Sequence, residues 1–60
     1  MLANTECIWG PLDGEMVPLF PSPNGMEFRL FYGPKADKIA VYALINGTLI
    51  FQRFLKRNDP

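Results

Sequence analysis

The sequence lacks histidine altogether and contains a single cysteine, Cys7. Without these residue types, one chain cannot assemble a Ser/His/Asp or Cys/His nucleophile, a disulfide framework or a Cys/His zinc site. We therefore expect no enzymatic activity and no cofactor or metal. No lysine or arginine stands beside Cys7, which predicts a small buried hydrophobe in a reducing compartment rather than a reactive thiol.

Long apolar runs and a secretory leader are also missing. The longest uninterrupted apolar run, Ile39 to Ile45, has seven residues, whereas about 20 are needed to cross a bilayer. The first ten residues have no basic start, and Glu6 interrupts their only apolar run. These features predict a soluble, cytoplasmic protein with no membrane partner.

The chain is short, with 60 residues, which is enough for one small domain spanning 1–60. Its core must be thin, because a chain of this length buries only about 60% of the surface that its unfolded form exposes. A partner or a second copy would add to its stability. Residues 1–5 and the polar residues 56–60 are expected to fray.

The neutral total charge conceals an uneven distribution. Residues 1–27 contain four acidic side chains and no basic one, whereas residues 28–60 contain all six basic side chains and two acidic ones. This asymmetry predicts an acidic patch, a basic patch or a head-to-tail contact, unless the two halves interleave in the fold.

Proline and glycine are concentrated in the first 34 residues, which hold five of the six prolines and four of the five glycines. Long helices are therefore excluded from this half of the chain. Three dipeptides, Asp13-Gly14, Asn24-Gly25 and Asn46-Gly47, are favoured centres of two-residue hairpin turns. The sequence thus predicts strands joined by tight turns.

The clearest predicted element is a hairpin with strands at 38–45 and 48–55 around Asn46-Gly47. Its turn fixes the register: one face pairs Ile45 with Thr48, Ala43 with Ile50, Val41 with Gln52 and Ile39 with Phe54, and the other pairs Leu44 with Leu49, Tyr42 with Phe51 and Ala40 with Arg53. Both faces are apolar near the turn. This predicts either a hairpin enclosed in a small barrel or one face covered by another molecule.

The segment 34–45 also fits a short amphipathic helix. Pro34 would occupy the first helical position, and apolar residues recur at helical spacing up to Leu44. Against this reading, Val41 and Tyr42 fall on the polar side, and four of the residues 39–45 are β-branched or aromatic. The strand is the favoured interpretation, and the helix is the alternative.

Three further strands are predicted at 6–9, 15–20 and 26–32. The last of these alternates regularly between apolar and polar or exposed positions from Met26 to Tyr32. Pro18 restricts the second to a sheet edge or a bulge. The expected fold class is therefore mainly β, a small antiparallel meander or barrel of four to five strands.

The segment Trp9-Gly-Pro-Leu-Asp-Gly is similar to a G-P-x-D-G turn near the N-terminus of some short, uncharacterised proteins from bacteria and their phages. The similarity spans Trp9 to Gly14. It implies a small β-rich protein of that kind, with no activity to transfer. The same residues also read as a simple tight turn in which Asp13 satisfies its own backbone.

The first functional hypothesis is a non-catalytic protein-interaction module, an adaptor or inhibitor from a phage or another mobile element. Its partner would be another protein or a second copy of the chain. The expected contact surface is the apolar hairpin face formed by Tyr42, Leu44, Leu49 and Phe51. Trp9 and Phe20 could instead cover this face from within the chain.

The alternative hypothesis is a small single-stranded nucleic-acid-binding domain. Tyr42 and Phe51 would stack on bases, since aromatic residues interleave with basic ones on the predicted strands. The basic side chains expected to contact nucleic acid are Arg29, Lys38, Arg53, Lys56 and Arg57. A net charge of zero falls short of the basic footprint usual for such domains.

Overall fold

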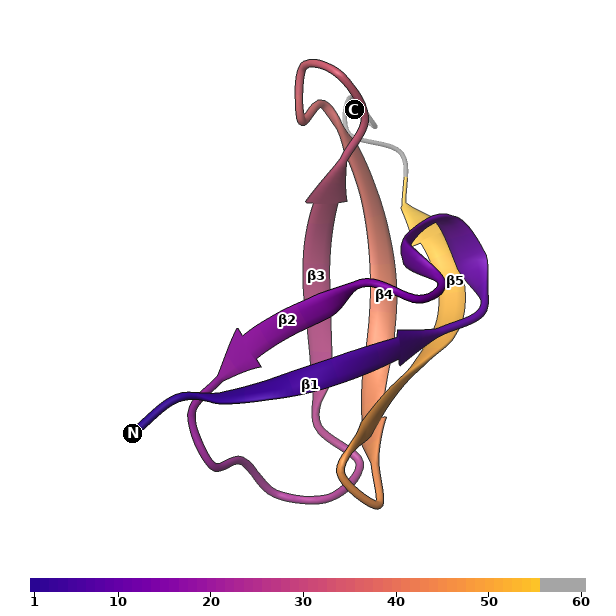
Figure 1. The fold of residues 1–60 in the computed structure, drawn as a ribbon. Coiled ribbons are helices and arrows are strands. Elements are labelled where there is room, and N and C mark those ends of the chain that lie inside the picture. The colour runs from indigo at the N-terminus through magenta and orange to yellow at the C-terminus, as the bar shows by residue number, and fades with distance from the viewer. Residues whose placement is uncertain (56–60) are drawn as a thin grey trace.

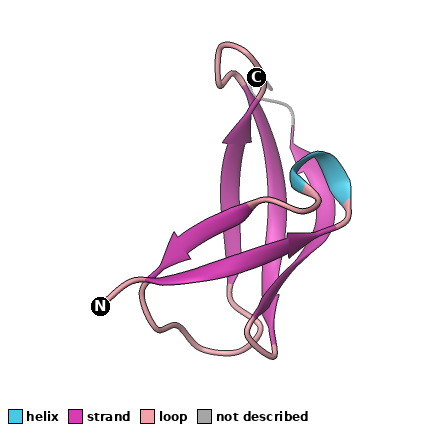
Figure 2. Cartoon of the chain, viewed as in Figure 1, coloured by secondary structure: helices cyan, strands magenta, loops and turns pink. Residues whose placement is uncertain are grey.

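The computed structural model describes residues 1–55, in which nearly all regular structure is strand (Figure 2). The elements are β1 (Ala3–Ile8), the 3-10 helix η1 (Gly10–Leu12), β2 (Met16–Leu19), β3 (Glu27–Tyr32), β4 (Lys38–Ile45) and β5 (Thr48–Leu55). The mainly β fold class is confirmed. The helical alternative for 34–45 is wrong, because β4 occupies most of that segment. No helix within residues 1–55 has the length and hydrophobicity to span a bilayer.

The strands form one curled sheet in the order β2-β1-β5-β4-β3. Strands β3, β4 and β5 form an antiparallel meander, and β1 and β2 form an antiparallel hairpin. The hairpin joins the meander where β1 runs parallel to β5, with Cys7 opposite Leu49 and Ile8 opposite Ile50. Figure 1 shows the hairpin lying across the meander, so that the sheet curls into half a barrel. The sheet is therefore mixed, antiparallel as predicted except at this contact.

Strand β1 begins earlier than predicted. Its first residues pair with the end of β2, Ala3 opposite Leu19 and Thr5 opposite Val17, so residues 3–5 belong to the sheet and the prediction that they fray is wrong. The bounds of β2 and β3 lie within one residue of those predicted, and those of β4 and β5 agree with the prediction. The predicted fraying of residues 56–60 lies outside the described residues.

The hairpin of β4 and β5 has the predicted register only near its turn. Tyr42 lies opposite Phe51 as expected, but a bulge then places Val41 opposite Arg53 rather than Gln52. The extra residue shifts everything beyond it by one position, so Phe54 lies opposite Ala40. As a result Phe54 shares a face with Phe51 and Tyr42, whereas the sequence register assigned it to the other face.

The core lies between the hairpin and the concave face of the meander. Its buried members are Cys7 from β1, Ala40, Tyr42 and Leu44 from β4, and Leu49 from β5. Half-buried apolar side chains from the other elements complete it: Leu12, Val17, Leu19, Phe28, Leu30, Tyr32 and Phe51. The even-numbered residues of β3 and β4 face the core, which is why burial alternates along β3, whereas residues 40–44 of β4 are buried on both faces.

Tyr42 ties the turn after β1 to the sheet. Its side chain is fully buried, and its hydroxyl donates a hydrogen bond to the Trp9 carbonyl at 2.6 Å while accepting one from the Leu12 amide at 2.9 Å. Both bonds connect residues about 30 positions apart in the chain. One phenol thus holds both ends of η1 against the core.

Burial raises the pKa of Tyr42 above its ordinary value of 10.0, and the nearby Cys7, Asp13 and Tyr32 add to the shift. The hydrogen bond from the Leu12 amide acts in the opposite direction, since it favours the phenolate. Because the folded pKa lies above the unfolded one, this stabilising contribution is complete below about pH 10 and is lost as the pH rises further.

Replacing Tyr42 with phenylalanine should lower the free energy of unfolding by about 1–3 kcal/mol, because the Leu12 N–H and the Trp9 carbonyl lose their partner. Urea denaturation from neutral to strongly alkaline pH measures this. The difference between the two proteins should be constant up to about pH 10 and shrink above it. A difference that grows with alkalinity would contradict the assignment.

Gly10, at φ 70°, leaves no room for a side chain. A Cβ at this position would lie 2.4 Å from Cδ1 of Phe51 and 2.8 Å from the Tyr42 hydroxyl. Gly14, at φ 85°, has nothing within 4 Å of the same position. Substituting alanine at Gly14 therefore introduces backbone strain alone, whereas the same substitution at Gly10 adds steric overlap.

Gly10→Ala should destabilise the protein by about 1–3 kcal/mol more than Gly14→Ala, because overpacking adds to the same left-handed strain of about 1–2 kcal/mol. Chemical denaturation of both variants checks this. Equal losses would show that Phe51 and Tyr42 move aside without cost.

Candidate functional site

The face expected to bind a partner is the interior of the protein. Tyr42, Leu44 and Leu49 are buried, and only Phe51 keeps partial exposure. The hairpin covers this face with Cys7, Val17 and Leu19. The prediction of a free contact surface there is therefore wrong: of the two possibilities left open by the sequence, the chain covers this face itself.

The opposite face of the meander is open to solvent but shielded at its centre. Val41 belongs to this face, yet only 1% of it is exposed, because it stands between Arg29 and Arg53 on the neighbouring strands. Arg53 also forms a two-pronged ion pair with Glu27 across β4, both contacts measuring 3.3 Å. Long charged side chains thus cover the apolar centre of this face.

Of the described basic residues proposed for nucleic-acid binding, only Arg29 and Arg53 share a face. Tyr42 cannot stack on a base, because it is buried with both hydroxyl bonds made. Arg29 and Arg53 lie on the outer face, whereas Lys38 pairs with Tyr32 on the face that carries the core. Lys56 and Arg57 lie outside the described residues.

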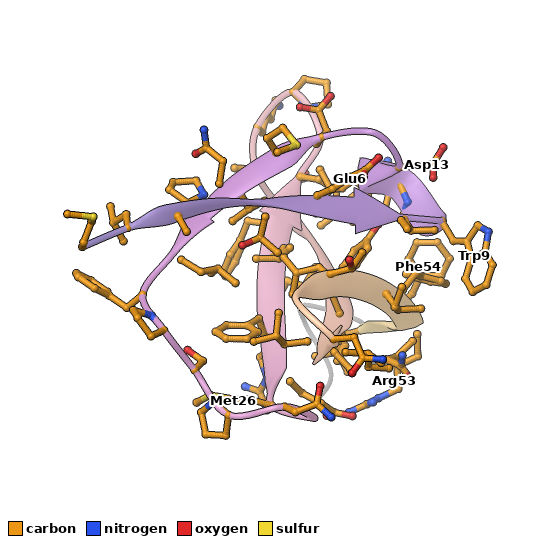
Figure 3. The ribbon with its side chains drawn as sticks, turned by 60° about the horizontal axis from the view of Figure 1, so that its bottom comes forward. Glu6, Trp9, Asp13, Met26, Arg53 and Phe54 are labelled. Atoms are coloured by element: carbon orange, nitrogen blue, oxygen red, sulfur yellow. The ribbon has the colours of Figure 1, made fainter. Side chains whose placement is uncertain are left out.

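Two exposed aromatic residues, Trp9 and Phe54, lie at one end of the sheet together with the half-buried Tyr32 and Phe51. We name as the aromatic end the four residues Trp9, Tyr32, Phe51 and Phe54. The ring of Phe54 lies 4.9 Å from that of Phe51 and 6.4 Å from that of Tyr32, with 61% of the residue exposed. Trp9 is 64% exposed and projects at the same side of the molecule in Figure 3. The bulge in β5 creates this cluster by moving Phe54, so the sequence register could not reveal it.

Trp9 has an unusual backbone. Its φ of 66° and ψ of 170° fall in a region that essentially only glycine adopts, and such a conformation costs about 1–3 kcal/mol. Two hydrogen bonds hold it there: the Trp9 amide donates to Oδ1 of Asp13 at 2.7 Å, and the Trp9 carbonyl accepts from Tyr42. The indole ring makes no ring contact with another aromatic residue in the part of the chain that is described. The backbone of Trp9 is thus held in a strained conformation while most of the residue is exposed to solvent.

Acidic side chains lie on the same hairpin as Trp9. Asp13 accepts a hydrogen bond from the Trp9 amide, and Glu6 projects from β1 (Figure 3). Glu15 and Glu6 also act on the thiol of Cys7: burial raises the pKa of this thiol, and the two carboxylates raise it further. The fully buried Cys7 is therefore kept protonated and inert. The end of the hairpin has a negative potential.

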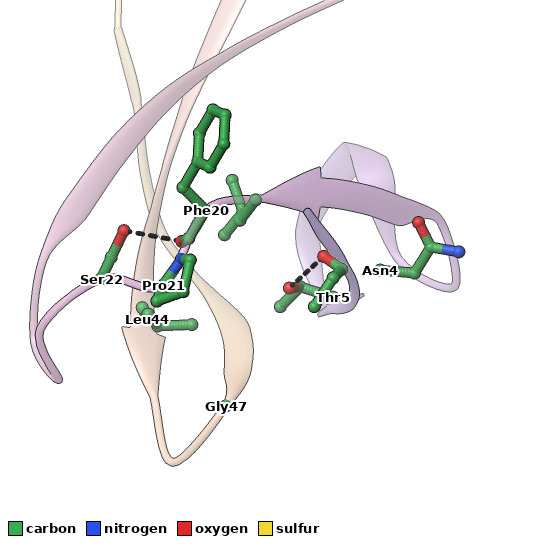
Figure 4. A pocket seen from close by; sticks show the side chains of 9 residues that line it. Asn4, Thr5, Phe20, Pro21, Ser22, Leu44 and Gly47 are labelled. Atoms are coloured by element: carbon green, nitrogen blue, oxygen red, sulfur yellow. Dashed lines mark hydrogen bonds between the residues drawn. The ribbon is translucent and has the colours of Figure 1, made fainter. Parts of the chain in front are cut away.

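An open pocket of about 350 Å³ lies at the other end of β1 (Figure 4). Its lining has no charged side chain: Ala3, Asn4, Thr5, Leu19, Phe20, Pro21, Ser22, Leu44 and Gly47. The hydroxyls of Thr5 and Ser22 are bonded to backbone carbonyls two residues away. Within residues 1–55, no three His, Cys, Asp or Glu side chains come together to hold a metal ion. The pocket therefore has no charged side chain, and both of its side-chain hydroxyls are already hydrogen-bonded.

Comparisons with protein-family models, with curated proteins and with solved structures give no match to this chain. Whatever the chain does must therefore be argued from its own residues, and among the described residues the aromatic end is the candidate site with the most distinctive geometry.

Proposed function

We propose that this protein is a non-catalytic protein-binding module whose contact surface is the aromatic end. The observation that carries the proposal is Trp9, whose backbone is strained and whose large apolar side chain is exposed. Strained residues concentrate where a ligand is held, and tryptophan is enriched among the residues that dominate binding energy. Phe54 extends the apolar surface beside the half-buried Phe51.

The charges around this surface define the chemistry of the partner. Asp13 and Glu6 favour a basic side chain next to the apolar contact, and an arginine there could also stack on the indole face. The phosphates of a nucleic acid would be repelled by the same carboxylates. We therefore propose a protein partner that offers an apolar side chain next to an arginine or lysine.

An adaptor or inhibitor role in a bacterium or phage is consistent with this mode of action. Such proteins act by occupying a surface on a larger partner, which requires a rigid contact site and no chemistry. The resemblance at Trp9 to Gly14 involves the segment that the Tyr42 hydroxyl fixes in place. The proposal therefore includes a bacterial or phage origin and a larger protein as the partner.

Trp9→Ala should weaken partner binding strongly, whereas Phe20→Ala should have little effect. Phe20 is a matched control, since it is 67% exposed and lies at the pocket end of the molecule. A partner captured by the tagged wild type is identified by mass spectrometry, purified and titrated by calorimetry. The loss for Trp9→Ala should be at least about 2 kcal/mol, about thirtyfold in Kd.

Two outcomes of that titration would overturn the proposal. One is equal affinity for the wild type and Trp9→Ala. The other is tight binding of a single-stranded oligonucleotide that weakens steeply with salt, which would support the nucleic-acid hypothesis instead.

The backbone strain predicts an unusual order of stabilities at position 9. Trp9→Gly should be more stable than Trp9→Ala by about 1 kcal/mol, because glycine adopts the observed φ and ψ without strain. At an ordinary exposed position the order would be the reverse. Thermal and urea unfolding of the two variants measures the difference, and alanine proving the more stable would show that Trp9 is not strained.

A further inference from the structure

The two edges of the sheet are not equivalent. The Cys7 amide donates to the Glu15 carbonyl at 2.8 Å, so in this hairpin the backbone N–H and C=O groups of the odd-numbered residues of β1 and β2 point toward the partner strand. Because these groups alternate in direction along an antiparallel strand, the backbone groups of Met16 and Pro18 on β2 point away from the sheet. Since proline has no N–H, this edge lacks one of the donors that a further strand would need.

The β3 edge keeps all its donors. The Leu44 amide donates to the Met26 carbonyl at 2.8 Å, so the backbone N–H and C=O groups of the even-numbered residues of β3 point toward β4. The backbone groups of Glu27, Arg29 and Phe31 therefore point away from the sheet. All three residues are exposed, and no described strand pairs with this edge.

We propose that β3 pairs antiparallel with β3 of a second copy, with Phe28 at the centre of the contact. In this register Glu27 lies opposite Arg29 of the other copy, twice by symmetry, and the two Phe28 rings meet on the opposite face. Arg29 forms no ion pair with any described residue, and Glu27 of the second copy, which also pairs with Arg53 of its own chain, would lie between two guanidinium groups. A register centred on Arg29 would oppose two guanidinium groups instead, which disfavours it.

The pairing extends the sheet across the two-fold axis and turns both outer faces to the same side. It leaves Trp9 and Phe54 free, because neither lies on β3, and Tyr32, the member of the aromatic end that does, lies at the far end of the strand from the Phe28 contact. The second copy therefore goes beyond the proposed partner binding, and the two can succeed or fail separately.

Methylation of a single backbone nitrogen tests the pairing directly. A synthetic chain N-methylated at Arg29 loses one outward donor per copy but none of the bonds to β4. The same modification at Met16, on the β2 edge, is the matched control. Sedimentation equilibrium over micromolar to millimolar concentrations should show dimers for the wild type and the Met16 form and monomers for the Arg29 form, all folded by circular dichroism.

The charge pattern is tested by substitutions, with the same sedimentation measurement. Arg29→Glu should raise the dimer dissociation constant about tenfold or more, because Glu27 then faces a carboxylate, whereas Lys35→Glu makes the same change of charge outside the sheet and should have little effect. A wild type that stays monomeric throughout, or a dimer indifferent to methylation at Arg29, would overturn the proposal. Running the series in a Trp9→Ala background keeps a failure here distinct from a failure of partner binding.

Discussion

The hydroxyl of Tyr42 is the point on which the arrangement of this small sheet depends. It lies at the centre of β4, deep in the core, and it reaches out of the meander to both ends of the η1 turn. Together with Asp13, it holds the backbone of Trp9 in a region suited to glycine, and it lies against Gly10, which is also packed closely against Phe51. A single buried polar group thus converts a thin apolar core into a defined relation between two halves of the chain.

The charge asymmetry of the sequence survives folding to a large extent. The hairpin and its turn carry Glu6, Asp13 and Glu15, and the meander carries the described basic residues. The meander also carries two acidic residues, Asp37 in the turn between β3 and β4 and Glu27, which begins β3 and forms its ion pair with Arg53 on the outer face. Acidic charge is thereby concentrated around Trp9, while the basic side chains of the outer face are partly neutralised.

Local signals in the sequence predicted much of the fold. The Asn46-Gly47 turn, the bounds of β4 and β5 and the edge position of Pro18 follow from turn chemistry and the missing donor of proline. Which face of β4 and β5 is buried could not be predicted, since both faces are apolar near their turn and only the docking of β1 and β2 decides between them. The bulge beside Val41 and the backbone of Trp9 also escaped prediction, because each is imposed by contacts between distant residues. The candidate site depends on both, which is why the sequence placed it on the wrong face.

The parallel contact between β1 and β5 spans only two residue pairs, yet it joins Cys7 to Leu49. All pairings within the meander and within the hairpin connect neighbouring segments and close short loops, whereas this one closes a loop of most of the chain. The contact between β1 and β5 therefore has the largest loop-closure cost of the pairings in the sheet. During synthesis, the core has to wait until β5 has left the ribosome, and until then the apolar face of the hairpin has nothing to cover it.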